Sequence, residues 1–109
     1  MSGLSRREKI EAMLQNEPND EFLRYGLACE YDNEGRDEEA WKLFDGLTRD
    51  NPPHVASFLR GAQLLVRMDR INEARAVLRT GIEEARRQGK MHPAGEMAEL
   101  LTELGKMGE

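Results

Sequence analysis

The sequence has little of what most secreted proteins and enzymes need. Its 109 residues include a single cysteine, Cys29, so the chain can form neither an internal disulfide nor a thiolate zinc site. No apolar run approaches the roughly 20 residues that span a bilayer, and the first residues lack the apolar stretch of a signal peptide. We therefore expect a cytoplasmic protein with no membrane partner.

Motifs for binding phosphate, metal or an acyl substrate are also absent. The sequence has no glycine-rich phosphate loop, no H-E-x-x-H, no paired cysteines and no G-x-S-x-G. His54 and His92 each lie beside a proline and far from one another, which is typical of turn or helix-start residues. The acids at 37–39 fit the first turn of a helix, where negative charge is favourable. We predict that the protein is not an enzyme and has no catalytic residue, metal site or cofactor.

The charge balance bears on nucleic-acid binding. With 21 Asp and Glu against 16 Lys and Arg, the net charge of −5 repels nucleic-acid phosphates on average. Basic residues concentrate over 54–90, between acidic segments. A nucleic-acid role would rest on this basic block, but its arginines spread around two predicted helices. We expect no nucleic-acid partner.

What the sequence does contain is an internal repeat. A shift of 34 residues pairs residues of similar size and polarity, namely Ala28 with Ala62, Tyr31 with Leu65, Ala40 with Ala74, Leu43 with Val77, and Phe44 with Leu78. The same shift backwards predicts a half unit at 5–18 before the full units at 19–53 and 54–90. Past Lys90 the match resumes with two extra residues, which predicts a C-terminal half repeat or capping helix at 91–105. All four form one domain, 1–109.

Within each unit the apolar residues lie three and four apart, as on one face of a helix, and no segment alternates as a strand does. Ser5 and Glu8 have the spacing of a capping box. The pattern predicts six helices, over 5–17, 20–33, 37–50, 54–67, 71–89 and 93–104. A pair of such helices cannot bury its apolar stripe alone, so neighbouring units must stack. The small residues expected at the helix contacts are Ala28, Ala40, Ala62, Ala74 and Ala98.

This pattern resembles the tetratricopeptide repeat, a 34-residue helix-turn-helix unit that follows W-x2-L-G-x2-Y, A-x3-F and a closing proline. The matching residues are Leu27-Ala28-x2-Tyr31, Gly35, Ala40-x3-Phe44 and Pro52 in the first unit, and Phe58, Gly61-Ala62-x2-Leu65, Ala74-x3-Leu78 and Gly81 in the second. Arg24 replaces the leading aromatic residue, and Asp69 replaces the turn glycine. The resemblance implies an all-α, right-handed helical-hairpin solenoid of six antiparallel helices.

The resemblance also implies a function as a non-catalytic protein-protein interaction scaffold. In that family the first helix of each pair lines a concave groove, which would here bind a peptide or a helix of a protein partner. On this mapping the partner-binding residues are Phe22, Tyr25, Cys29, Asn33, Leu59, Arg60, Gln63 and Arg67, with Asp32, Glu99 and Glu103 beside them.

Alternatives stay open at several of these positions. Phe22 and Tyr25 would equally serve to cover the first half unit, and Cys29 fits a small packing residue. Arg60 and Arg67, two helical turns apart on one face, would either hold an acidic peptide or face solvent.

Self-association is an alternative to the groove as a whole. The half units at both ends and the alternating charge blocks fit a homo-oligomeric structural protein, such as a homodimer, that assembles through its end helices. Trp41, the single tryptophan, is expected to be half-buried against a neighbouring helix.

Overall fold

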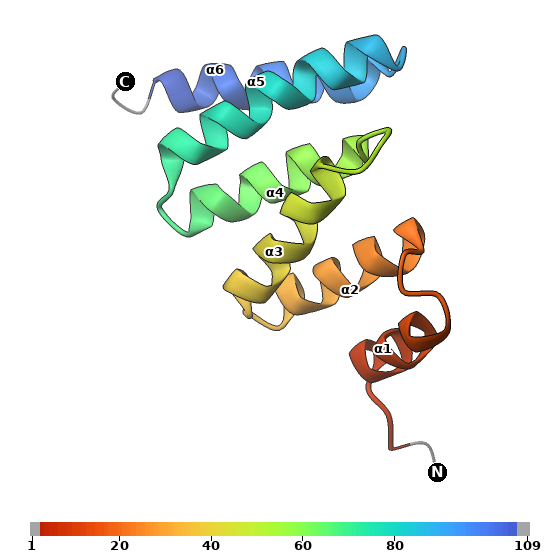
Figure 1. Cartoon of the computed structure of the whole chain (residues 1–109). Helices are drawn as coiled ribbons and strands as arrows, with labels where there is room; N and C mark the ends of the chain where they lie inside the picture. Colours follow the sequence, from red (N-terminus) through yellow and green to blue (C-terminus); the bar gives the residue numbers. More distant parts are fainter. Residues whose placement is uncertain (1–2, 107–109) are drawn as a thin grey trace.

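The computed structural model describes residues 3–106, which form six helices joined by short connections (Figure 1). The helices are α1 (Arg6–Asn16), α2 (Glu21–Asn33), α3 (Asp37–Thr48), α4 (Val55–Arg67), α5 (Ile71–Arg87) and α6 (Met91–Gly105). Each packs against the next in the chain, and α1 and α6 lie at opposite ends of a body that measures 50 × 29 × 19 Å. No strand occurs within residues 3–106. The predicted all-α stack of helical hairpins is confirmed.

Two of the helices, α1 and α2, begin at residues whose side chains cap the helix. The Ser5 hydroxyl accepts a hydrogen bond from the Glu8 backbone N–H, and the Glu8 carboxylate accepts one from the Ser5 backbone N–H, which completes the predicted capping box. Asp20 caps α2 in the same manner, because its carboxylate accepts from the Leu23 backbone N–H at 2.8 Å. All six predicted helices are present, with ends within two residues of the prediction.

Three helix ends, at Thr48, Arg87 and Met91, lie two residues from the prediction, and two of these differences have an identifiable reason. Helix α6 begins at Met91 rather than at Pro93, because a proline in the first turn lacks only a backbone N–H that would have no partner within the helix. Helix α5 ends at Arg87 rather than at 89, because Gly89 takes a left-handed conformation with φ +74° that stops the helix.

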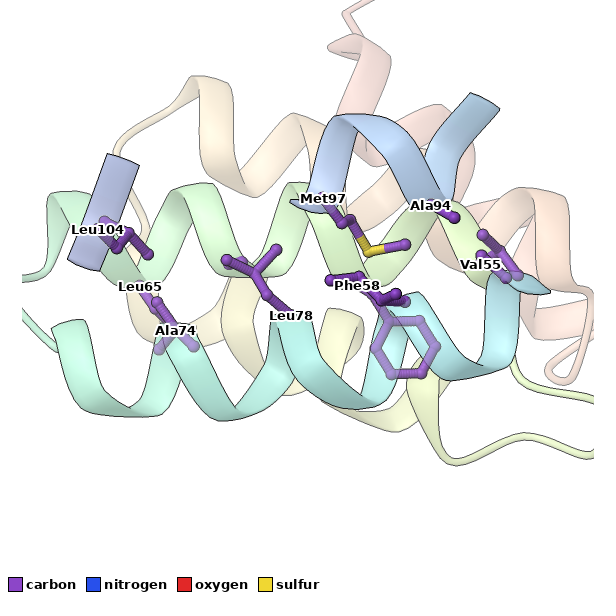
Figure 2. Close-up of a cluster of buried hydrophobic side chains, with 11 residues drawn as sticks. Val55, Phe58, Leu65, Ala74, Leu78, Ala94, Met97 and Leu104 are labelled. Carbon is purple, nitrogen blue, oxygen red and sulfur yellow. The ribbon is translucent and has the colours of Figure 1, made fainter. Parts of the chain in front are cut away.

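The apolar residues form two cores that meet at α4. The C-terminal core is drawn in Figure 2 and consists of Val55, Phe58, Ala62, Leu65, Ala74, Leu78, Ile82, Ala85, Ala94, Met97 and Leu104. The N-terminal core consists of Ala28, Ala40, Phe44 and Leu64. Leu64 and Leu65 are adjacent on α4 yet belong to different cores, and the half-buried Trp41 packs against both, as expected. Helix α4 therefore joins the two halves of the stack.

The small residues lie at the helix contacts. Ala28, Ala40, Ala62 and Ala74 have no exposed surface, which fits the prediction that they let helices approach closely. Ala98 is only half-buried, because α6 is the last helix and none follows it within residues 3–106.

The two turns inside the units provide a test of backbone strain. Gly35 has φ +76°, and Asp69, the residue 34 positions later, has φ +59°. Glycine adopts this conformation without strain, whereas a residue with a side chain is disfavoured there. We expect Asp69→Gly to raise the free energy of unfolding by up to about 1 kcal/mol in urea denaturation. Gly35→Ala should lower it by a similar amount, and a gain in stability from Gly35→Ala would contradict this account.

Candidate functional site: the groove between α2, α4 and α6

Two adjoining hollows follow α4. The larger, of about 540 Å³, is lined by Leu59, Gln63, Glu96, Glu99, Leu100, Thr102 and Glu103. The smaller, of about 250 Å³, is lined by Tyr25, Val55, Ala56, Leu59, Arg60, Gln63, Pro93 and Glu96. Because both include Leu59, Gln63 and Glu96, they form one continuous depression, which we call the α2/α4/α6 groove.

The fold places these three helices on the same side. Each of them starts a predicted unit, and the helices that alternate with them, α3 and α5, pack between successive members. Leu59 lies at the C-terminal core while also lining both hollows, so the floor of the groove is continuous with the packed interior. The packed core therefore holds the floor of the groove in place.

The structure brings together some of the residues predicted to bind a partner and separates others. Tyr25, Leu59, Arg60 and Gln63 line the groove, together with Glu99 and Glu103. Sequence reasoning missed Glu96, although its position three residues before Glu99 on the same helix could have revealed it.

The remaining predicted residues lie away from the hollows. Cys29 is half-buried against the N-terminal core, and Asn33 is exposed at the end of α2, where its amide donates a hydrogen bond to Glu30. Neither lines the groove.

Phe22 lies in a separate depression at the N-terminal end of the stack. This hollow of about 260 Å³ between α1 and α2 is lined by Arg6, Lys9, Ile10, Met13, Phe22, Leu23 and Gly26. Phe22 is 83% exposed and Met13 is 49% exposed, so Phe22 does not cover the first half unit, the alternative role considered for it.

Arg60 and Arg67 both bind a buried carboxylate within the chain. The Arg60 Nε donates to Asp32 Oδ2 at 3.0 Å, and the Arg67 Nη2 donates to Asp32 Oδ1. The Asp32 side chain is only 4% exposed. The Arg67 Nη2 also lies 3.8 Å from Oδ1 of Asp37. Asp32 therefore connects α2 to α4, and its two arginines are engaged inside the protein rather than held ready for an acidic ligand.

Tyr25, which lines the groove, and Cys29, which does not, are both half-buried. The Tyr25 ring packs edge-on against Phe44, with 5.8 Å between ring centroids. Burial raises the pKa of the Tyr25 hydroxyl and that of the Cys29 thiol, so both stay protonated near neutral pH. A thiol with a raised pKa is a poor nucleophile, which agrees with a packing role for Cys29.

His54 lies at the start of α4, beside the groove. Its Nδ1 is 2.7 Å from the hydroxyl of the fully buried Ser57, and its ring centroid is 4.9 Å from that of Tyr25. Burial lowers the pKa of the His54 imidazole below its ordinary value of 6.5. The folded protein therefore favours the neutral ring.

The lowered pKa of His54 predicts a pH dependence of stability. Between the folded pKa and 6.5, the unfolded chain binds a proton that the folded protein does not, so the free energy of unfolding falls as the pH falls. The contribution is fully present above 6.5 and is lost as the pH drops through the folded value. Urea denaturation of the wild type and of His54→Gln at several pH values should show a smaller loss in the variant. Equal losses on acidification would contradict this assignment.

Within residues 3–106, no group of three or more His, Cys, Asp or Glu side chains is arranged to hold a metal ion. In the same part of the chain, none of the helices combines the length and apolar character that a membrane span requires.

Comparison with known proteins gives similar solved structures. Two are structures, one in solution and one in a crystal, of a tetratricopeptide repeat domain protein from Salinibacter ruber. The solution structure is 30% identical, covers 80% of this chain and 88% of its own, and superposes with a TM-score of 0.75. The crystal structure is 28% identical, covers 81% and 99%, and has the same TM-score of 0.75.

A solution structure of a protein from Bordetella parapertussis shares the fold. It is 19% identical, covers 95% of this chain and 90% of its own, and has a TM-score of 0.81. No protein-family model matches the sequence, and no curated protein matches it either.

Proposed function

The chain belongs to the tetratricopeptide repeat family, whose members are in general protein-interaction modules, and from this premise we propose that it binds a peptide or helix of a protein partner in the α2/α4/α6 groove without catalysing a reaction. The observation that carries the proposal is the continuity of the two hollows along α4. Together they join Tyr25 at one end of the depression to Glu103 at the other.

The composition of the groove supports recognition of a polypeptide. Leu59 and Leu100 offer apolar surface, and Gln63 offers an amide that can donate and accept hydrogen bonds with a backbone. A partner that fills the groove would cover a strip across three helices. That arrangement is typical of helix-in-groove and extended-peptide recognition.

The proposal is tested by obstructing the groove without disturbing the core. Gln63 is exposed and lines both hollows, so Gln63→Trp should fill the depression and leave the fold intact. Ala76→Trp, on the exposed part of α5 outside the groove, is the matched control. Affinity capture of the tagged protein from its own cells should lose its partners with the first variant and keep them with the second. Equal retention by both variants would overturn the proposal.

Self-association through the end helices is a second candidate, favoured by the exposed hollow around Phe22. Arg6 and Lys9 line this depression, and α6 at the opposite end of the stack carries the carboxylates Glu99 and Glu103, so these two pairs of side chains have opposite charge. A second copy could therefore dock end to end. Sedimentation over a range of concentrations should show association that Phe22→Asp abolishes, and a monomer throughout would reject this candidate.

A further inference from the structure

The charge of the groove differs from what the sequence suggests. Arg60 is the cationic side chain that lines it, and Arg60 is bound to the buried Asp32. Arg67 is bound to the same carboxylate. An incoming acidic group would have to compete with an ion pair that is already formed, partly shielded from solvent and shared between α2 and α4. The groove therefore does not present an available cation to an anionic ligand.

Carboxylates, by contrast, line the opposite wall. Glu96, Glu99 and Glu103 lie three and four residues apart on α6, so they share one helix face and line the larger hollow. The Glu96 Oε1 lies 3.6 Å from His92 Nε2, and the Glu103 Oε1 lies 3.5 Å from Lys106 Nζ. Both contacts are largely exposed to solvent. Glu99 forms no ion pair with any residue in 3–106.

This row of like charges disfavours the helix that carries it. Like charges three or four residues apart repel one another on a helix surface, and within residues 3–106 no ion pair of Glu99 offsets that repulsion. A cationic ligand would relieve that repulsion on binding. The same carboxylates would thus slightly lower the stability of the free protein and raise its affinity for a cationic ligand. Carboxylates that only face solvent would not raise that affinity.

The floor between the two walls is apolar. Leu59 and Leu100 are half-buried at the C-terminal core and line the larger hollow, while Tyr25 and Pro93 line the smaller one. A ligand that fills this groove must therefore offer apolar side chains to the floor and positive charge to α6.

We propose that the occupant of the α2/α4/α6 groove is a cationic amphipathic segment of a partner protein. Its Lys or Arg side chains lie against Glu96, Glu99 and Glu103, and its apolar side chains lie on Leu59 and Leu100. This inference rests on the proposed function, because it names the chemistry of the partner for the same groove.

Three synthetic peptides of about 14 residues, roughly four helical turns, test the charge preference. They share one pattern of leucines and carry only Lys, only Gln or only Glu at the polar positions. In fluorescence anisotropy the Lys peptide should bind about tenfold more tightly than the Gln peptide, as expected for a few partly exposed charge pairs, and the Glu peptide should bind least. Raising the salt from about 50 to about 300 mM should weaken binding of the Lys peptide alone.

Variants of the wall test its location. Glu99→Gln and Glu103→Gln together should weaken binding of the Lys peptide several-fold and raise the melting temperature of the free protein slightly. Glu83→Gln, which removes an exposed carboxylate from α5, is the matched control and should leave binding of the Lys peptide unchanged. Equal binding of the Lys and Gln peptides, binding of none of the three, or equal weakening by Glu83→Gln would overturn the inference.

The outcome separates this inference from the proposed function. If Gln63→Trp removes cellular partners while the Lys peptide shows no preference, the groove still binds its partner but the charge assignment is wrong. If the Lys peptide binds equally well to Gln63→Trp and to the wild type, it does not occupy the groove, and the inference fails whatever the capture experiment shows.

Discussion

Replacing Gly81 with alanine should lower the stability of the protein, although alanine is the better helix former. A Cβ atom at position 81 of α5 would lie 2.6 Å from the Cβ of Phe58 and 2.6 Å from the Sδ of Met97. Figure 2 shows Phe58 and Met97 side by side in the C-terminal core. The Met97 sulfur can move, but the Phe58 Cβ is fixed to the backbone of α4, so α4 and α5 would have to separate.

The magnitudes decide the direction of this effect. Overpacking a core costs about 1–3 kcal/mol, whereas exchanging glycine for alanine within a helix gains about 1 kcal/mol. We expect a net loss of up to about 2 kcal/mol and a fall of several degrees in the melting temperature, since each kcal/mol corresponds to about 4–8 °C in a domain of this size.

Gly95→Ala is the matched control for Gly81→Ala. Gly95 is exposed on α6, and a Cβ added there would meet nothing within 4 Å. The same exchange should therefore stabilise the protein by up to about 1 kcal/mol through helix propensity alone. If thermal melts show that both variants gain stability, the close approach of α4 and α5 at position 81 is wrong.

The second large effect is expected from Asp32→Asn. The asparagine has nearly the same shape but no charge, so both ion pairs are lost at a side chain that is only 4% exposed. Its amide oxygen can still accept from one arginine, whereas its NH2 group cannot accept from the other. Breaking a buried ion pair costs about 3–5 kcal/mol when the remaining charge is fully buried. Arg60 and Arg67 are 33% and 53% exposed and can regain water, so we expect a smaller loss of about 2 kcal/mol in the free energy of unfolding, measured in urea.

A neighbouring carboxylate provides the comparison for Asp32→Asn. Asp37 Oδ1 lies 3.8 Å from Nη2 of Arg67, but the Asp37 side chain is 40% exposed. Asp37→Asn should therefore change the free energy of unfolding by less than about 0.5 kcal/mol. Equal effects of the two substitutions would show that burial does not set the strength of the Asp32 contacts.

Much of the fold could be predicted from the sequence because it follows from spacing. The 34-residue phase of Ala28, Ala40, Ala62 and Ala74 placed residues with no side chain beyond Cβ at the helix contacts, and all four are fully buried. Helix ends were predicted to within two residues, because capping residues, prolines and Gly35 act locally. The spacing of the apolar residues and the residues at the helix ends suffice to predict such a stack, because each helix pair contacts only its neighbours.

The charges of the groove could not be predicted in the same way. Asp32 lies four residues after Ala28, on the buried side of α2, and a charge at such a position indicates a cationic partner. Which cation it binds depends on how α3 places α4 relative to α2, since the two arginines lie 28 and 35 positions further along the chain. Phe22 was predicted to line the groove but lines the hollow between α1 and α2 instead. The repeat pattern identifies the helix that starts a unit, but it does not show which face of that helix turns toward the groove.

The two ends of the stack differ in how firmly they are held. In α1 only Ile10 is buried, Leu14 is half-buried, and polar contacts add to these, such as the hydrogen bond of 3.1 Å from the Tyr31 hydroxyl to Glu11. A linear array loses order from its weakest terminus, so opening should start at this amino-terminal turn and proceed inward. The proposed groove begins at α2, beyond this turn. We therefore expect fraying of the first helix to leave the walls of the proposed groove in place.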